Sequence, residues 1–128
     1  MILLTVDLGE TSGWCLFKDG KLYQYGTLML NEHMEFIDLV ATHVVLERPA
    51  LVEFGVKAES FARIVAMYSI RFGKKLQMVR PTDWKQRYGK FPLPGRGVLK
   101  TQHERDAYRI GIWYMEKENI IHSEGLRK

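Results

Sequence analysis

The sequence predicts a single α/β domain, residues 1–128, built on a five-stranded mixed sheet with three antiparallel strands first and helices on its flanks. Three observations predict it. The chain opens with an apolar run, and two strand-like runs follow around an Asp-Gly turn. Further along, two short apolar runs alternate with stretches of helical spacing. Finally, a length of 128 residues suits one domain, and a hydrophobic content of 46% is enough for a folded core.

The first thirty residues predict three strands. Residues 2–6, ILLTV, form a short apolar run bounded by Asp7 and Gly9, which is typical of a central strand. Residues 13–17, GWCLF, and residues 21–30, KLYQYGTLML, flank the sequence KDGK. Because Asp-Gly between strand-like runs is a strong hairpin signal, we expect these three strands to pair antiparallel.

The middle of the chain alternates between helix and strand. Residues 31–39 fit a short helix capped by Asn31, and residues 42–47, THVVLE, fit a fourth strand. Residues 57–72 have helical spacing, with one apolar stripe that could face the core or a second copy of the chain. The stripe comprises Phe61, Ile64, Val65 and Tyr68. Residues 75–79, KLQMV, fit a fifth strand.

The last third of the chain predicts two helices separated by a loop. Residues 81–88 begin with proline, which favours the first turn of a helix, and residues 89–100 hold three glycines and two prolines, which indicates a mobile loop. Thr101 and Glu104 have the spacing of a capping box, so a final helix should run to about Glu118. This order of strands and helices is typical of a ribonuclease-H-like fold.

Cysteine content, hydropathy and charge predict the compartment of the protein and the kind of partner it binds. Cys15 is the single cysteine, so no intrachain disulfide is possible, and its apolar surroundings favour a packing role. No stretch approaches the ~20 apolar residues of a membrane span, and we expect no signal peptide, no membrane contact and a cytoplasmic location. Residues 1–79 carry a net charge of −1 and residues 80–128 a net charge of +5, which indicates an anionic partner or a solvated basic surface.

Three acidic residues stand at the ends of predicted core elements. Asp7 ends the first strand, Glu47 ends the fourth, and Asp106 lies in the first turns of the last helix. His103 precedes Asp106 by three residues and shares its helix face. We expect these side chains to meet at one end of the sheet, with Gly9 and Gly13 letting the chain turn away and leaving room there for metal ions and phosphate.

The chemistry of such a cluster points to divalent cations. Clustered carboxylates repel one another, and their burial costs free energy unless cations neutralise them. Oxygen ligands suit Mg²⁺ or Mn²⁺, and two such ions ~3.5–4 Å apart can activate water and stabilise the leaving oxygen of a phosphodiester. Each residue alone also has an ordinary explanation, as a turn residue, a surface ion pair or a helix-start residue.

Residues 80–100 carry six basic side chains and one acidic side chain, Asp83. Basic side chains neutralise phosphates and release counterions. The interleaved Trp84, Tyr88 and Phe91 could stack on unpaired bases or pack in the core. We predict that this segment contacts DNA through Arg80, Lys85, Arg87, Lys90, Arg96 and Lys100.

Four motifs, in order, carry a resemblance to a known family. They are VDLGETSGW at residues 6–14, HVVLERPAL at residues 43–51, RPTDWKQRYG at residues 80–89 and HERDAYRIGIW at residues 103–113. The set resembles the RuvC family of Holliday junction resolvases over residues 1–115. The first motif alone is unspecific, whereas the ordered set is fairly specific.

The resemblance implies a ribonuclease-H-like nuclease that acts as a symmetric homodimer on four-way DNA junctions. Such enzymes nick two opposed strands, use Mg²⁺ or Mn²⁺, two ions per active site, and leave 5′-phosphates; no small-molecule cofactor is expected. Carried over by position, the metal-binding catalytic set comprises Asp7, Glu47, His103 and Asp106. Lys85 and Lys100 match basic residues that the family places near the scissile phosphate.

The chain also departs from the family. It is short and resembles the compact phage-borne members, which implies a phage-encoded enzyme in a bacterial host. The family places an aromatic residue soon after the second acidic residue, where it wedges into the junction. Ala50 and Leu51 occupy the nearest positions in this chain, and Phe54 is the closest aromatic residue. Forks and flaps are therefore further candidate substrates. The alternatives are a nuclease for RNA or RNA–DNA hybrids, an inactive nucleic-acid-binding module, and an actin-like nucleotide-binding domain, which would need a second such domain.

Overall fold

The structure is a computed structural model that describes residues 1–36, 41–48 and 56–122. Ala50, Leu51 and Phe54, the positions nearest to a junction wedge, lie outside the described residues, as does the end of the helix expected at residues 31–39.

Five strands form one mixed sheet in the order β3-β2-β1-β4-β5. The strands are β1 (Ile2–Asp7), β2 (Thr11–Lys18), β3 (Lys21–Met29), β4 (His43–Glu47) and β5 (Leu76–Val79). β1, β2 and β3 pair antiparallel, whereas β4 lies parallel to β1 and β5 lies parallel to β4. The predicted fold class is confirmed, and the apolar β1 occupies the centre of the sheet, buried on both faces.

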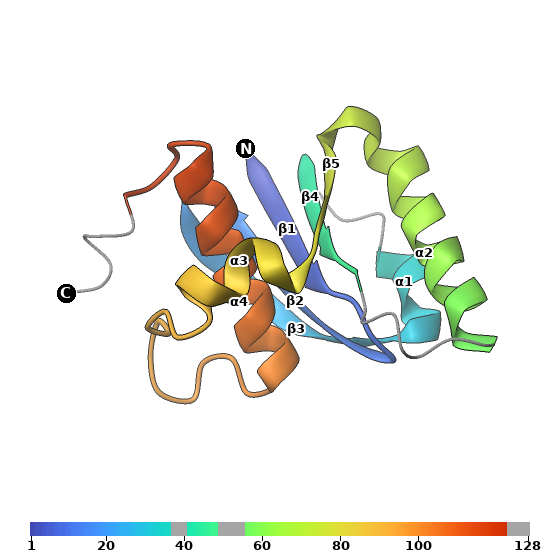
Figure 1. The fold of residues 1–128 in the computed structure, drawn as a ribbon, viewed down its shortest axis with the longest axis horizontal. Coiled ribbons are helices and arrows are strands. Elements are labelled where there is room, and N and C mark those ends of the chain that lie inside the picture. The colour runs from blue at the N-terminus through green and yellow to red at the C-terminus, as the bar shows by residue number, and fades with distance from the viewer. Residues whose placement is uncertain (37–40, 49–55, 123–128) are drawn as a thin grey trace.

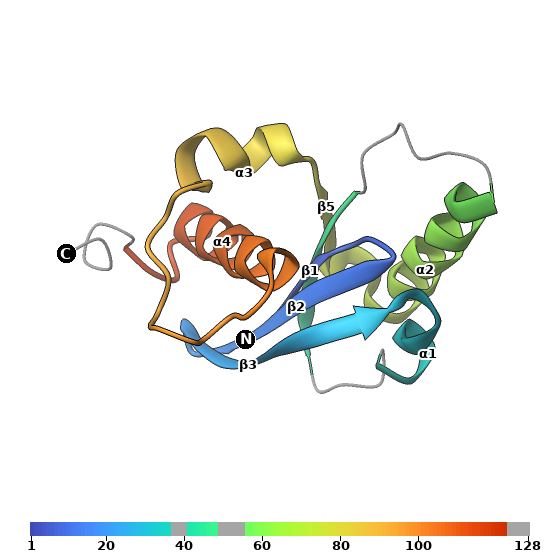
Figure 2. The ribbon, with the colours of Figure 1, turned by 90° about the horizontal axis from the view of Figure 1, so that it is seen from below.

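Helices cover both faces of the sheet. They are α1 (His33–Phe36), α2 (Val56–Phe72), α3 (Pro81–Tyr88) and α4 (Gln102–Lys117). α1 and α2 lie on one face, and α4 lies on the other with α3 beside it (Figures 1 and 2). None of the described helices combines the length and the apolar character that crossing a lipid bilayer requires.

Each face of the sheet has its own apolar core. On the α2 side, the predicted stripe is buried at Phe61, Ile64 and Tyr68 and packs against the sheet, so the stripe serves the core. On the α4 side, Trp84, Tyr88 and Phe91 are at most 2% exposed. These aromatic side chains therefore pack in the core and are not available to stack on DNA bases.

One local prediction is wrong. Asn31 does not cap the first helix, because a 3₁₀ turn begins at Leu30 and the Glu32 carboxylate accepts the Met29 N–H at 2.6 Å. The segment 89–100 is a loop, as expected, but it is tethered by α4. Arg105 Nε donates to the Leu99 carbonyl and Arg109 Nε to the Phe91 carbonyl, each at 3.1 Å. The two tethered residues, Phe91 and Leu99, are buried.

A buried histidine links α1 to the turn that follows β1. The His33 ring nitrogens lie 2.9 Å from the Tyr68 hydroxyl and 3.1 Å from the Ser12 hydroxyl. Ser12 in turn accepts the Gly9 N–H and donates to the Gly9 carbonyl. Burial lowers the pKa of His33 to about 4, against the opposing charge of Glu32. His33 is therefore neutral in the folded chain at physiological pH.

We expect His33 to make the protein sensitive to acid. Below pH 6.5 the unfolded chain binds a proton at this side chain that the folded chain does not bind until about pH 4, so the free energy of unfolding falls as the pH drops through this window. The loss due to His33 should reach up to about 3 kcal/mol. Urea unfolding between pH 7.5 and 4.5 should show a shallower pH dependence in H33Q than in the wild type.

The matched control is H122Q, because His122 is exposed near the end of the described chain. The control should keep the wild-type pH dependence. Equal pH slopes for H33Q and the wild type would contradict this role for His33.

Candidate active site

Two carboxylates end adjacent parallel strands at the same edge of the sheet. Asp7 of β1 and Glu47 of β4 are paired in register, and each residue is 7% exposed. Because neighbouring parallel strands have the same direction, their last side chains project at one edge. The sequence prediction that Asp7 and Glu47 meet at one end of the sheet therefore agrees with the structure.

α4 approaches these carboxylates because β2 has no side chain in its path. Gly13 lies opposite Asp7 in the β1–β2 pairing, and a Cβ at Gly13 would clash with the backbone of His103 and Glu104. The buried Thr5 hydroxyl donates to the Ala107 carbonyl at 2.7 Å and fixes α4 on β1. Gly13 therefore makes room for α4, and the interpretation that it makes room for metal ions and phosphate is wrong.

His103, in the first turn of α4, reaches Asp7 directly. Its Nδ1 lies 2.7 Å from Asp7 Oδ2, and the His103 side chain is 48% exposed. When the Asp7 carboxylate is ionised, it can only accept, so a neutral His103 carries its proton on Nδ1 and keeps a lone pair on Nε2. That lone pair is able to bind a metal ion or take a proton from water.

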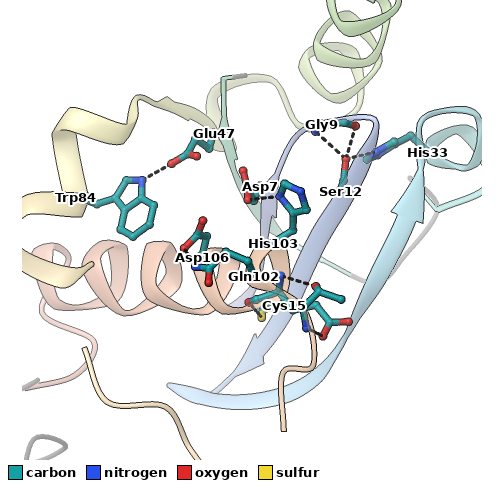
Figure 3. A network of polar contacts seen from close by, with 12 residues as sticks. Asp7, Gly9, Ser12, Cys15, His33, Glu47, Trp84, Gln102, His103 and Asp106 are labelled. Carbon is teal, nitrogen blue, oxygen red and sulfur yellow. Dashed lines mark hydrogen bonds and ion pairs between the residues drawn. The ribbon is translucent and has the colours of Figure 1, made fainter. Parts of the chain in front are cut away.

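Asp106 belongs to the same group of side chains. One turn further along α4, its Oδ1 accepts a hydrogen bond from Gln102 Nε2 at 2.8 Å. Its negative charge contributes to raising the pKa of both Asp7 and Glu47. Figure 3 shows Asp7, Glu47, His103 and Asp106 around one region between α4 and the strand ends.

Burial makes the paired carboxylates costly to ionise. It raises the pKa of Glu47 to about 8, and the adjacent Asp7 charge adds to this rise, whereas a hydrogen bond from Trp84 opposes it. Burial also raises the pKa of Asp7, against the lowering effect of the His103 hydrogen bond and charge. Near neutral pH, one proton therefore remains on this pair unless a cation takes its place.

The donor set fits a hard divalent cation, although the side chains are not gathered around one point. Asp7, Glu47 and Asp106 supply carboxylate oxygens, and His103 supplies one nitrogen, which suits Mg²⁺ or Mn²⁺. Within the described part of the chain, no three such side chains are placed so that they could hold a metal ion together. Metal binding would therefore require new side-chain rotamers, including a change at the His103–Asp7 hydrogen bond.

Sequence reasoning missed the immediate partner of Glu47. The buried indole of Trp84 donates its Nε1–H to Glu47 Oε2, and Trp84 is 1% exposed. The sequence left Trp84 open between stacking on bases and packing in the core, and the structure places it in the core. Periodicity carries no information on where an indole N–H points. Cys15 packs in the core as expected, and burial raises the pKa of its thiol.

The predicted DNA-binding residues are all exposed. Arg80 pairs with Asp83 at 3.5 Å, and Arg87 lies 3.6 Å from Glu116. The other four basic side chains form no ion pair within the described residues. They are Lys85, Lys90, Arg96 and Lys100. Lys100 directly precedes the α4 capping box, where its N–H donates to Glu104 at 2.6 Å, so it lies one turn before His103.

Comparison with known proteins identifies the fold. No family model matches the chain, and no curated protein matches it. Among solved structures, Thermus thermophilus RuvC in complex with a Holliday junction substrate matches with a TM-score of 0.70 and 12% identity, over 94% of this chain and 97% of that chain. Fowlpox virus resolvase with Holliday junction DNA matches with a TM-score of 0.56 and 14% identity, over 92% and 99%. The chain therefore has the RuvC-like, ribonuclease-H-like fold that its sequence predicts.

Proposed function

We propose that this chain is a single-domain endonuclease that resolves four-way DNA junctions with Mg²⁺ or Mn²⁺ and leaves 5′-phosphates. The observation that carries the proposal is the pair of buried carboxylates, Asp7 and Glu47, at adjacent strand ends under His103 and Asp106 of α4. The fold adds support, because RuvC and the fowlpox virus resolvase, each solved with junction DNA, share it.

The proposed metal ligands are Asp7, Glu47, Asp106 and His103. Two bound ions would supply an activated water and neutralise the charge that develops on the leaving oxygen. This charge balance matches the electrostatics of the site. Burial raises the pKa of Asp7 and Glu47, and the charge of Asp106 adds to both rises, as the charge of Asp7 does for Glu47. A purely structural role would leave two buried acids side by side, compensated only in part by His103 and by a retained proton.

The other side chains orient and attract the substrate. His103, held by Asp7 through Nδ1, has one free ring nitrogen, Nε2, which either binds a metal ion or takes the proton of the attacking water, but not both at once. Lys85 and Lys100 are exposed on α3 and just before α4, where they can bind the phosphate that is cut. One site cuts one strand, so paired nicks require two sites, and we propose a two-fold symmetric homodimer.

Cleavage of a labelled four-way junction tests the function. We expect paired nicks across the junction in Mg²⁺ or Mn²⁺, and a loss of at least ~100-fold in rate for D7N, because removing a direct ligand should cost no less than removing a partner of a ligand. The matched control is D19N. Asp19 lies in the β2–β3 turn at the far end of the sheet with φ of 53°, a conformation that asparagine also accepts.

Parallel substrates separate the alternatives. Cutting of flaps and forks besides the junction would show a broader debranching nuclease, in line with the missing wedge aromatic. Cutting of an RNA–DNA hybrid alone would contradict junction resolution and favour an RNA-directed nuclease. Junction binding with no metal-dependent cutting would contradict an enzyme and favour a binding module, whereas ATP binding would support an actin-like domain.

The basic loop should bind DNA phosphates. In a D7N background, which prevents cutting, K90Q/R96Q should weaken junction binding and lower the slope of log affinity against log salt by about 2, because each lost phosphate contact contributes about 0.9. The control is K74Q/K75Q, which removes the same charge from exposed residues before β5, at the opposite end of the sheet from Glu47. Equal effects of both double variants would contradict a local DNA-binding surface.

A further inference from the structure

Trp84 is held rigidly over the end of β4. α3 begins directly after β5, and its first turn is fixed by Asp83 Oδ2, which accepts the Arg80 N–H at 2.9 Å. The Arg48 N–H donates to the Val79 carbonyl at 3.0 Å and ties the ends of β4 and β5 together. As a result, the Trp84 indole lies in the core between the sheet, α3 and α4, with its N–H directed at Glu47.

An indole N–H imposes a defined geometry on its acceptor. It can only donate and cannot change protonation state, so the Glu47 carboxylate has one oxygen, Oε2, committed to Trp84. A buried ring has little freedom to move, and the neighbouring Asp7 is the other side chain that hydrogen-bonds to the Glu47 carboxyl group. The rotation of the Glu47 carboxyl group is thereby restricted.

We propose that Trp84 is a positioning residue that restricts the rotation of the Glu47 carboxyl group through its indole N–H and thereby favours metal binding by Glu47. This inference rests on the proposed function, because it assumes that Glu47 binds a metal ion. Partners of ligating carboxylates typically change metal affinity by about 10–100-fold when they are lost.

The test compares W84F with W113F. Phenylalanine at position 84 keeps an aromatic ring in the core but removes the donor. Trp113 is a partly buried tryptophan of α4 that belongs to the same apolar cluster, and within the described residues its indole N–H has no hydrogen-bond acceptor. Calorimetric titration of the full chain with Mn²⁺ should give a dissociation constant about 10–100-fold weaker for W84F and unchanged for W113F.

A second readout is the indole N–H resonance of Trp84 in ¹⁵N-labelled protein, identified as the one that remains when Trp14 and Trp113 are each replaced by phenylalanine. We expect this resonance to shift in E47Q and during titration with Mg²⁺. The indole resonance of a tryptophan that only fills the core would not shift when Glu47 is replaced or when Mg²⁺ is added. This readout uses the wild type and E47Q, so it tests the positioning role even if W84F folds poorly.

The outcomes separate this inference from the proposed function. Wild-type protein that binds neither Mn²⁺ nor Mg²⁺ would overturn the proposed function and, with it, the positioning role. Wild-type binding together with unchanged affinity in folded W84F would overturn the positioning role alone. An indole resonance that responds to neither E47Q nor Mg²⁺ would overturn it as well.

Discussion

The arrangement of this site depends on the close contact between the first turn of α4 and Gly13 of β2. A side chain at Gly13 would clash with the backbone of His103 and Glu104 and push the helix off the sheet. The hydrogen bond from Thr5 to the Ala107 carbonyl fixes the same helix on β1. Because α4 is fixed at this point, His103 reaches Asp7, and Asp106 lies near enough to influence both strand-end carboxylates.

The same contact brings acidic side chains together in a buried position, where ionising them costs free energy. Asp7 and Glu47 are buried next to each other, and each is partly compensated by a donor from a helix, His103 for Asp7 and Trp84 for Glu47. These donors orient the carboxylates but do not neutralise both of them, as the raised pKa of each shows. A site that holds such acids close together without full compensation is suited to a divalent cation.

The sequence predicted the parts of this arrangement that local patterns encode. The apolar run of β1, the hairpin turn, the α2 stripe and the α4 capping box each have a short-range signature, and each appears in the structure. The contacts that set the site geometry are long-range. Neither the clearance at Gly13, nor the direction of the Trp84 indole, nor the tethering of the loop by Arg105 follows from spacing along the chain.

The central claim is that the ends of β1 and β4 and the start of α4 together form a metal site. Anomalous diffraction from crystals soaked in Mn²⁺ tests it most directly. We predict an Mn²⁺ peak bound by oxygens of Asp7 and of at least one of Glu47 and Asp106. A structure with Mn²⁺ bound only elsewhere, or with none bound at these carboxylates, would contradict it.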